Sequence, residues 1–194
     1  MNFITDIFNR DYYFKLGERR NTFQKIFEYL ESLSKESPTI LETGIARTDE
    51  NWEGDGMSSL MFDKYINEVG GNFTSIDINP SNVSFARSKL SSKSNLICSD
   101  SVIQLHKISR DEEYPMIDVL YLDSFDLDWN NPIPSSFHHM KELLAIYPKI
   151  QKGTLIVVDD NANNTGKGQM VKDFMKNIGI NPYFDEYQIG FIYE

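Results

Sequence analysis

Two apolar runs of this chain end in residues that could bind a nucleoside. Residues 40–44 read ILETG and residues 73–80 read FTSIDINP. In an open α/β sheet, a glycine at the carboxyl end of one strand lets the backbone approach a ligand, and an acid ending the next strand can accept hydrogen bonds from both ribose hydroxyls. Gly44 and Asp77 therefore predict a nucleoside pocket.

Further acidic residues end the apolar runs that we interpret as strands. Because the carboxyl ends of parallel strands meet at one edge of a sheet, these carboxylates should share one rim. Their mutual repulsion would be costly unless a cation lies among them. The pattern predicts a metal ion, a positively charged ligand, or both, beside Glu42, Asp77, Asp100, Asp123, Asp159 and Asp160.

Helix-like and strand-like segments alternate along the chain that supplies these residues. Such alternation predicts a parallel α/β sheet covered by helices on both faces, with right-handed crossovers, and the final pair of strands looks like a hairpin. We expect helices at 21–34, 57–69, 81–90, 102–108, 134–144 and 167–177, and strands at 39–43, 73–77, 95–99, 117–123, 154–160, near Tyr183 and at 189–193.

Size and composition predict one globular domain. The chain has 194 residues, of which 40% are hydrophobic and 25% charged, enough for a sizeable core. We predict a single domain over residues 1–194, with an N-terminal helical cap at 1–36 and a Rossmann-like core at 37–194.

Charge and cysteine content narrow the expected partners and location. A net charge of −10 argues against a nucleic-acid partner. The single cysteine, Cys98, excludes an intramolecular disulfide and favours a reducing compartment. The first residues lack a signal pattern and no apolar run approaches about 18 residues, so we expect a cytoplasmic protein without a membrane partner.

The motifs ILETG, GMSSL, SIDINP, CSDS, LYLDS and VVDDN, in this order, resemble those of class I S-adenosylmethionine-dependent methyltransferases. They are most similar to metal-dependent O-methyltransferases of the catechol O-methyltransferase and macrocin O-methyltransferase-like kinds. The resemblance covers roughly residues 39–171. It implies a three-layer, Rossmann-like sheet of about seven strands whose last strand is antiparallel. It also implies methyl transfer to a small hydroxylated acceptor, such as a sugar, a natural-product glycoside or a phenol, and leaves a homodimer open.

The resemblance assigns cofactor contacts residue by residue. Glu42 and Gly44 would lie at the methionine and ribose side, and Gly56 and Ser58 at a helix start near the cofactor carboxylate, where free N–H groups favour an anion. Asp77 would hold the ribose hydroxyls and Ile78 would pack on adenine. The remaining cofactor contacts that it implies are Asp100, Ser101 and Asp123. For Gly44 and Asp77, the alternative is a tight turn and a solvated strand end.

A divalent-metal site is the second implication of the resemblance. Asp123, Asp160 and Asn161 match the two aspartates and one asparagine of the catechol-type magnesium site, and Asp159 could replace or assist Asp160. Hard oxygen ligands of this kind suit Mg²⁺, with Ca²⁺ or Mn²⁺ as substitutes. The ion would orient an acceptor hydroxyl and lower its pKa. Alternatively, these residues only cap the loop after the fifth strand.

The chain departs from the catechol-type pattern at the expected general base. Residues 123–126 read DSFD, so no lysine closely follows Asp123. Asp123, Asp126 and His139 are the catalytic candidates, with His138 as a further one. Polar positions on a helix are the alternative for the two histidines.

The segment between Gly44 and Gly56 is longer than the family's usual glycine loop. It could form a lid, with Trp52 over the cofactor and Arg47 reaching an acid or the cofactor carboxylate, or it could be a solvated insertion. Aromatic side chains could wall the acceptor pocket or pack in the core. They are Tyr13, Phe14, Phe125, Trp129 and Phe137.

Two other functions remain open from the sequence. A nicotinamide-dependent Rossmann oxidoreductase is disfavoured because Gly44 does not begin a GxGxxG motif. A module that binds S-adenosylmethionine without catalysis is compatible with the missing lysine.

Overall fold

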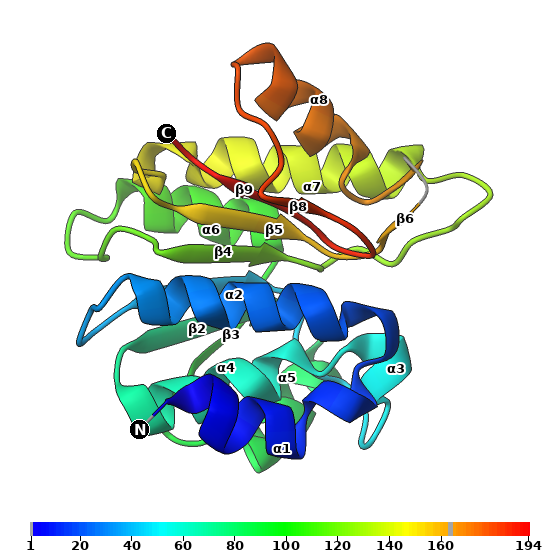
Figure 1. Ribbon diagram of the computed structural model, residues 1–194. Coiled ribbons are helices and arrows are strands. Elements are labelled where there is room, and N and C mark those ends of the chain that lie inside the picture. The colour runs from blue at the N-terminus through cyan, green and yellow to red at the C-terminus, as the bar shows by residue number, and fades with distance from the viewer. Residues whose placement is uncertain (1, 163–164) are drawn as a thin grey trace.

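The computed structural model describes residues 2–162 and 165–194 (Figure 1). Its longer helices are α2 (Arg20–Ser32), α4 (Ser58–Val69), α5 (Pro80–Lys89), α6 (Ser101–Arg110), α7 (Ile133–Ile146) and α8 (Gln169–Asn177). Short helical turns are η1 (Ile4–Phe8), α1 (Asn9–Asp11), η2 (Tyr13–Lys15), η3 (Gly17–Arg19), α3 (Trp52–Asp55) and η4 (Tyr147–Lys149).

One seven-stranded sheet forms the centre of the fold. Its order is β3-β2-β1-β4-β5-β9-β8, parallel from β3 to β5, with β9 antiparallel to both of its neighbours. This confirms the predicted sheet and its antiparallel last strand. The strands are β1 (Thr39–Thr43), β2 (Asn72–Asp77), β3 (Asn95–Cys98), β4 (Val119–Leu122), β5 (Leu155–Val158), β8 (Phe184–Asp185) and β9 (Ile189–Ile192), and β6 (Asn161–Ala162) pairs with β7 (Thr165–Gly166) outside the sheet.

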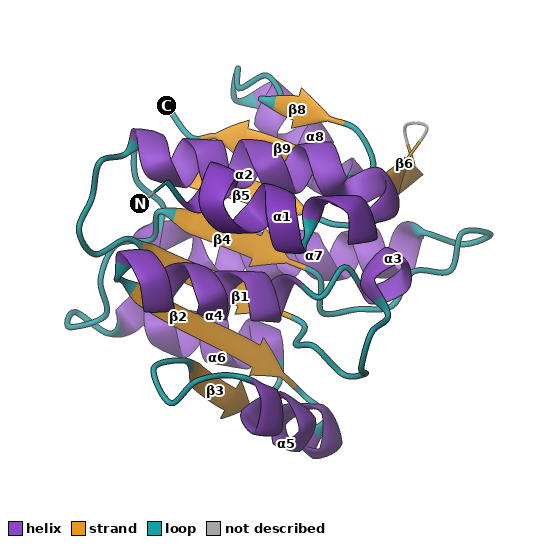
Figure 2. Cartoon of the chain, turned by 60° about the horizontal axis from the view of Figure 1, so that its bottom comes forward, coloured by secondary structure: helices purple, strands orange, loops and turns teal. Residues whose placement is uncertain are grey.

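Helices cover both faces of this sheet, as the alternating pattern predicts. Figure 2 shows α1, α2 and α4 in front of the sheet and α6, α7 and α8 behind it. The central strands β1, β4 and β5 are buried at every residue, which agrees with the continuous apolar runs of β4 and β5. No helix in the described ranges is long and apolar enough to cross a membrane.

The N-terminal segment packs into one of these layers. Phe3 and Phe8 join Phe23 and Phe27 of α2 in the core cluster that covers one face of the sheet. Apolar residues of α2 recur at helical spacing, which buries one side of the helix. Residues 2–32 therefore form part of the layer on the sheet, and they bring Arg19 to the end of β5.

Candidate functional site

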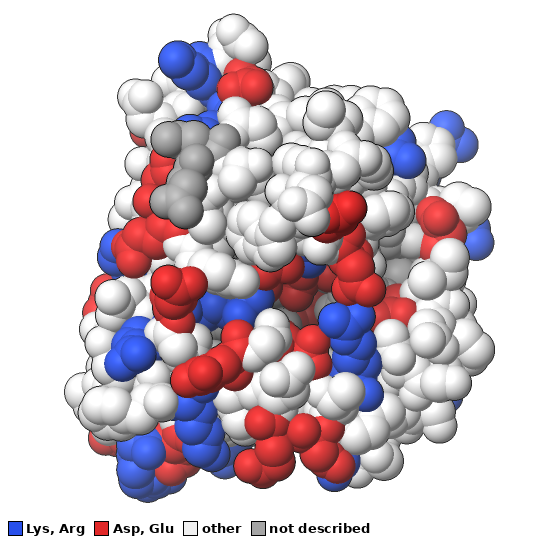
Figure 3. All heavy atoms as spheres, turned by 90° about the vertical axis from the view of Figure 1, so that its right-hand side faces the viewer, with Lys and Arg blue, Asp and Glu red and all other residues white. Residues whose placement is uncertain are grey.

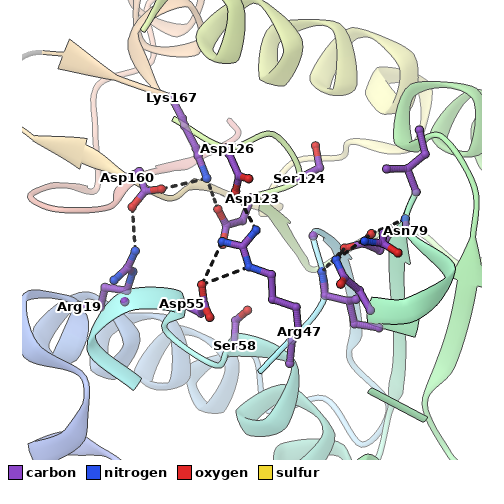
Figure 4. Close-up of a pocket in the computed structure, with 17 residues that line it drawn as sticks. Arg19, Arg47, Asp55, Ser58, Asn79, Asp123, Ser124, Asp126, Asp160 and Lys167 are labelled. Atoms are coloured by element: carbon purple, nitrogen blue, oxygen red, sulfur yellow. Dashed lines mark hydrogen bonds and ion pairs between the residues drawn. The ribbon is translucent and has the colours of Figure 1, made fainter. Parts of the chain in front are cut away.

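A pocket of about 260 Å³ opens where the parallel strands end. Figure 3 shows this side of the molecule, with a hollow bordered by acidic and basic side chains. Figure 4 shows the residues that line it. They include the predicted cofactor residues Gly44, Ser58, Asp77, Ile78 and Asp123, and also Arg19, Arg47, Asp55, Asn79, Asn82, Ser124, Asp126, Asp160 and Lys167.

Gly44 lines the pocket directly after β1, which lies between β2 and β4 in the sheet. Its φ of +83° is left-handed, and an added Cβ would overlap the carbonyl oxygen of Asp123. Its N–H donates to Ile76 O at 2.9 Å, while the N–H of Asp123 donates to Thr43 O at 2.9 Å. Only glycine fits this position without strain. The close approach seen here is between Gly44 and the backbone of Asp123, whereas the sequence predicts one between Gly44 and a ligand.

Asp77 forms the part of the pocket that suits a ribose. Its Oδ1 accepts a hydrogen bond from Asn79 N at 2.7 Å and its Oδ2 one from Ile45 N at 3.2 Å. These bonds fix the carboxylate at the pocket wall. The neighbouring Ile78 is 68% exposed and lines the same pocket, which gives a polar group and an apolar surface side by side. A nucleoside has the same combination of surfaces.

Glu42 lies beneath the pocket and is fully buried, so the prediction of direct cofactor contact is not supported. Its carboxylate accepts hydrogen bonds from Ser58 Oγ at 2.5 Å, Ser59 Oγ at 2.6 Å and Ser75 Oγ at 2.5 Å. Ser59 Oγ in turn accepts one from Ala46 N at 3.0 Å. Glu42 therefore joins the start of α4 to β2 and to the loop after β1.

Three other predicted cofactor residues also lie outside the pocket lining. Asp100 caps α6, because its Oδ1 accepts a hydrogen bond from Ile103 N at 2.9 Å. Ser101 is buried, with its Oγ 3.1 Å from His138 Nε2. Gly56 has a left-handed φ of +67° and packs on the side chain of Arg19. Their positions indicate structural roles.

Glu42 is expected to make stability depend on pH. Burial raises its pKa from 4.5 to about 7, although the three serine hydroxyls oppose the shift. The folded chain then binds a proton more tightly than the unfolded chain, so this stabilisation is full below pH 4.5 and lost as pH rises through 7. The free energy of unfolding of Glu42→Gln, measured relative to that of the wild type, should rise by about 2 kcal/mol from about pH 5 to about pH 7.5. Urea denaturation across this range measures the difference, and a constant value would contradict the assignment.

Two buried cations hold the acidic cluster at the ends of β4 and β5. One oxygen from each of Asp123, Asp159 and Asp160 lies within 4.8 Å of the others. Lys167 Nζ is hydrogen-bonded to Asp123 Oδ1 and lies 2.9 Å from Asp160 Oδ2. Arg19 donates from Nε to both oxygens of Asp159, at 2.9 and 3.0 Å, and from Nη2 to Asp160 Oδ1 at 2.7 Å. Figure 4 shows Lys167 between Asp160 and Asp123.

The charges of this cluster are mutually dependent. Burial alone would raise the pKa of Asp159, but the charge and hydrogen bonds of Arg19 outweigh it and lower that pKa. Burial raises the pKa of Asp123 well above its usual range despite the opposing charge of Lys167. Burial alone would lower the pKa of Lys167, but the surrounding carboxylates outweigh burial and raise it. The surrounding carboxylates therefore favour the ammonium form of Lys167, which is unsuited to act as a general base.

Arg19 also belongs to a buried network that joins distant parts of the chain. Gln188 Nε2 donates to Asp159 Oδ1 at 3.0 Å and to the hydroxyl of Tyr121 at 2.6 Å. Gln188 Oε1 accepts a hydrogen bond from Thr22 Oγ1 at 2.5 Å. The network fixes α2, β4 and the β8–β9 turn around the cluster, so the guanidinium is held in place from several sides.

The cluster as arranged does not fit a divalent ion. Both oxygens of Asp159 and both of Asp160 already contact Arg19 or Lys167. The predicted ligand Asn161 is turned away, because its Nδ2 donates to Asp185 Oδ1 and Glu186 O at 3.0 Å each. Asn161 Oδ1 is buried without a hydrogen-bond partner among the described residues, but Asn161 does not line the pocket.

Of the catalytic candidates, Asp126 and Asp123 line the pocket and His139 does not. His139 is fully buried, and its Nδ1 lies 2.7 Å from Ser135 O. Burial lowers the pKa of His139 to about 4, so it is neutral near pH 7. The structure does not support His139 as a base. His138 lies near Ser101 and also outside the lining.

The segment between Gly44 and Gly56 crosses one side of the pocket. Arg47 lines it and bridges Asp55 at 3.1 Å and Asp126 at 2.9 Å, as the prediction that it reaches an acid requires. Trp52 instead packs on Tyr12, with ring centroids 5.4 Å apart, and against the core. The predicted role of Trp52 over the cofactor is not supported.

The five aromatic residues predicted to wall the acceptor pocket lie outside its lining as described. Phe125 is 42% exposed and its ring centroid lies 5.2 Å from that of His138. Tyr13 packs on Phe8 in the N-terminal layer. Phe14, Trp129 and Phe137 are exposed. An acceptor wall from these residues is therefore not present in this conformation.

Similarity to known proteins is found in structure alone. No family model and no curated protein matches the chain. The solved structure of MycE methyltransferase from the mycinamycin biosynthetic pathway, in complex with Mg, SAH and mycinamycin VI, matches with a TM-score of 0.61 and 15% identity. The match covers 90% of this chain and 49% of MycE, so the chain spans about half the length of that protein.

Two further solved structures have the same fold. The calicheamicin methyltransferase CalS11 matches with a TM-score of 0.58 and 11% identity, over 91% of this chain and 81% of CalS11. LepI in complex with SAM matches with a TM-score of 0.54 and 10% identity, over 86% of this chain and 46% of LepI. At these identities the likeness concerns architecture. The chain has the Rossmann-like fold of the MycE and CalS11 methyltransferases.

Proposed function

We propose that this chain transfers a methyl group from S-adenosylmethionine to a hydroxyl of a small acceptor, such as a sugar, a natural-product glycoside or a phenol. The observation that carries the proposal is one pocket with two chemically different ends. Asp77 and Ile78 follow β2 on one side of β1 and suit a nucleoside, whereas Asp123 and Asp126 follow β4 on the other side, beside Lys167. The fold shared with MycE and CalS11 and the sequence motifs support this reading.

The nucleoside would lie along the ends of β1 and β2. Asp77 would accept hydrogen bonds from the ribose hydroxyls, and the exposed face of Ile78 would pack on the adenine. Ser58 begins α4 and lines the pocket, so the helix start faces the cavity. Free N–H groups at that point favour an anion, which suits the carboxylate of the methionine part.

The methyl group would then face the charged end of the pocket. In the transfer, a lone pair of the acceptor oxygen forms the new C–O bond as the C–S bond breaks and its electrons stay on sulfur. The hydroxyl proton passes to a carboxylate at this end, for which Asp126 is our candidate. Positioning supplies most of the rate enhancement in such an in-line displacement.

Mg²⁺ remains an expectation of the sequence resemblance alone. The MycE structure is a complex with Mg, which is a property of that protein. In this chain the aspartates of the cluster contact Arg19 and Lys167. We therefore assign no step to a metal.

Titration calorimetry with S-adenosylmethionine, SAH, NAD and NADP tests the cofactor. We expect binding of the first two only, whereas preferential NAD binding would favour the oxidoreductase alternative. A methyl-donor turnover assay against a panel of hydroxylated compounds then separates an enzyme from a module that only binds the cofactor. Transfer to none of them, together with tight cofactor binding, would favour the module.

Asp77→Ala is expected to weaken S-adenosylmethionine binding by roughly 1.5–3 kcal/mol, because it removes charge-assisted hydrogen bonds to the ribose. Calorimetric dissociation constants measure the loss. Asp77 also fixes the loop that begins at Ile45. Asp77→Asn keeps one acceptor oxygen and most of the shape, so it should weaken binding less. Unchanged affinity in Asp77→Ala would reject the ribose role.

A further inference from the structure

Lys167 is a buried cation at the acceptor end of the pocket. Its side chain is 3% exposed and touches Asp123 and Asp160, which are 19% exposed each. Arg19, also 3% exposed, holds the other oxygen of Asp160 together with Asp159. Two side-chain cations therefore lie among three aspartates, at a place where the sequence pattern predicts a metal ion or a positively charged ligand.

Charge repulsion prevents a divalent ion from occupying the acidic cluster together with Lys167 and Arg19. A divalent ion among the carboxylates would lie a few ångströms from the ammonium and the guanidinium, and like charges repel strongly at that distance away from bulk water. It would also have to replace the hydrogen bonds of Arg19 to both oxygens of Asp159 and to one oxygen of Asp160, and the ion pair of Lys167 with the other oxygen of Asp160. A displaced, buried ammonium without a partner would be costly. The folded chain therefore stabilises its carboxylates internally.

Lys167 is placed where its positive charge can act on a ligand in the pocket. It lines the pocket together with Asp123, Ser124 and Asp126, and Figure 4 shows it across the pocket from Asn79. An ammonium has three N–H donors, and among the described residues Lys167 has one hydrogen bond, to Asp123, and one ion pair, to Asp160. The third donor can bind an acceptor oxygen in the pocket. A fixed positive charge beside that oxygen favours the developing negative charge as its proton leaves.

We propose that the Lys167 ammonium, held by Asp123 and Asp160 and supported by Arg19, is the resident cation of the acceptor site and makes methyl transfer independent of a divalent metal. The catalytic part of this inference rests on the proposed function. The cation-binding part does not, because it concerns the acidic cluster itself. The two parts can therefore be tested separately.

Metal titration tests the cation-binding part without any substrate. Calorimetry and thermal unfolding with Mn²⁺ and with Mg²⁺ should show no site in the wild-type chain. Lys167→Ala frees carboxylate oxygens, so it should gain a Mn²⁺ site and bind at least about 10-fold more tightly than the wild type, with an upward shift in Tm. Lys172→Ala is the matched control: it removes a lysine that pairs with Asp185 outside the pocket lining, and should gain no site.

Measurements on the wild-type chain alone can overturn the cation-binding part of the proposal, even if Lys167→Ala does not fold. Stoichiometric Mn²⁺ binding by the wild type that Asp160→Asn abolishes would show that the metal displaces Lys167. If folded Lys167→Ala binds Mn²⁺ no better than the wild type, the inference also fails. A lack of S-adenosylmethionine binding would instead reject the proposed function and leave the metal result standing.

Turnover tests the catalytic part once an acceptor is found. EDTA should leave the wild-type rate unchanged, and Lys167→Met should lower kcat on the order of 100-fold, because a preorganised charge at the reacting oxygen is lost. The dissociation constant for SAH should change by less than about 3-fold, since Lys167 lies away from the nucleoside end. Loss of wild-type activity with EDTA, or an unchanged kcat in Lys167→Met, would overturn the role of Lys167.

Discussion

Gly44→Ala is expected to destabilise the fold by about 3 kcal/mol or more and to abolish cofactor binding. An L residue at a φ of +83° is strained by about 1–2 kcal/mol. The new Cβ would also overlap the backbone carbonyl of Asp123, and such overpacking costs about 1–3 kcal/mol more. The rigid ends of β1 and β4 would have to separate at the pocket floor. Urea denaturation and calorimetry with SAH measure the two losses.

Gly179→Ala is the matched control for this substitution. Gly179 has a similar φ of +86°, but no atom lies within 4 Å of its added Cβ. Gly179→Ala should therefore lower the free energy of unfolding only by the cost of backbone strain, about 1–2 kcal/mol, and should leave SAH affinity unchanged. The difference between the two variants isolates the close approach at Gly44. Equal losses in both would contradict our description of the pocket floor.

Arg19→Met is expected to cost about 3–5 kcal/mol, because it leaves the fully buried carboxylate of Asp159 without its main partner. Arg19 also contacts Asp160 and stacks on Tyr187, with its Cζ 4.5 Å from the ring centroid. The lowered pKa of Asp159 in the folded chain means that this stabilisation exists at neutral pH and is lost as pH falls through that pKa. Urea denaturation at pH 7 measures the loss.

Arg10→Met provides the comparison at the surface. Arg10 pairs with Asp11, but its side chain is 68% exposed, so little change in stability is expected. Combining Arg19→Met with Asp159→Asn removes the unpaired charge and should recover at least about 1 kcal/mol of the loss. If Arg19→Met is no more harmful than Arg10→Met, the buried pair does not stabilise the fold.

The sequence predicts those parts of the site that depend on strand ends. Gly44 and Asp77 end neighbouring parallel strands, and the rules of open α/β sheets place such residues at one rim. Cations do lie among the acids at the ends of β4 and β5, but they are Lys167 and Arg19 of the chain itself rather than the metal ion or charged ligand that the sequence predicts. Gly44 and Asp77 both line the pocket. Local pattern is sufficient for these features because the backbone of each strand fixes the position of its last side chain.

The identity of the cations could not be predicted in the same way. Arg19 lies 140 residues from Asp159 along the chain, and no local spacing encodes such a contact. The conformation of the turn after β5 could not be predicted from the sequence either. Strand alternation would point only one of Asp159 and Asp160 inward, but Asp160 leaves the strand with a left-handed φ of +46°, so both carboxylates reach Arg19. Asn161 turns toward Asp185 as a result of the chain path after this turn.

The network around Gln188 has a consequence for biosynthesis. Gln188 lies next to the last strand and contacts Asp159 and Thr22, whereas Arg19 and Thr22 are made early. During translation, Asp159 emerges before its partner from the β8–β9 turn exists. A nascent chain that has not yet reached residue 188 therefore lacks one of the hydrogen-bond donors that hold the Asp159 carboxylate in place.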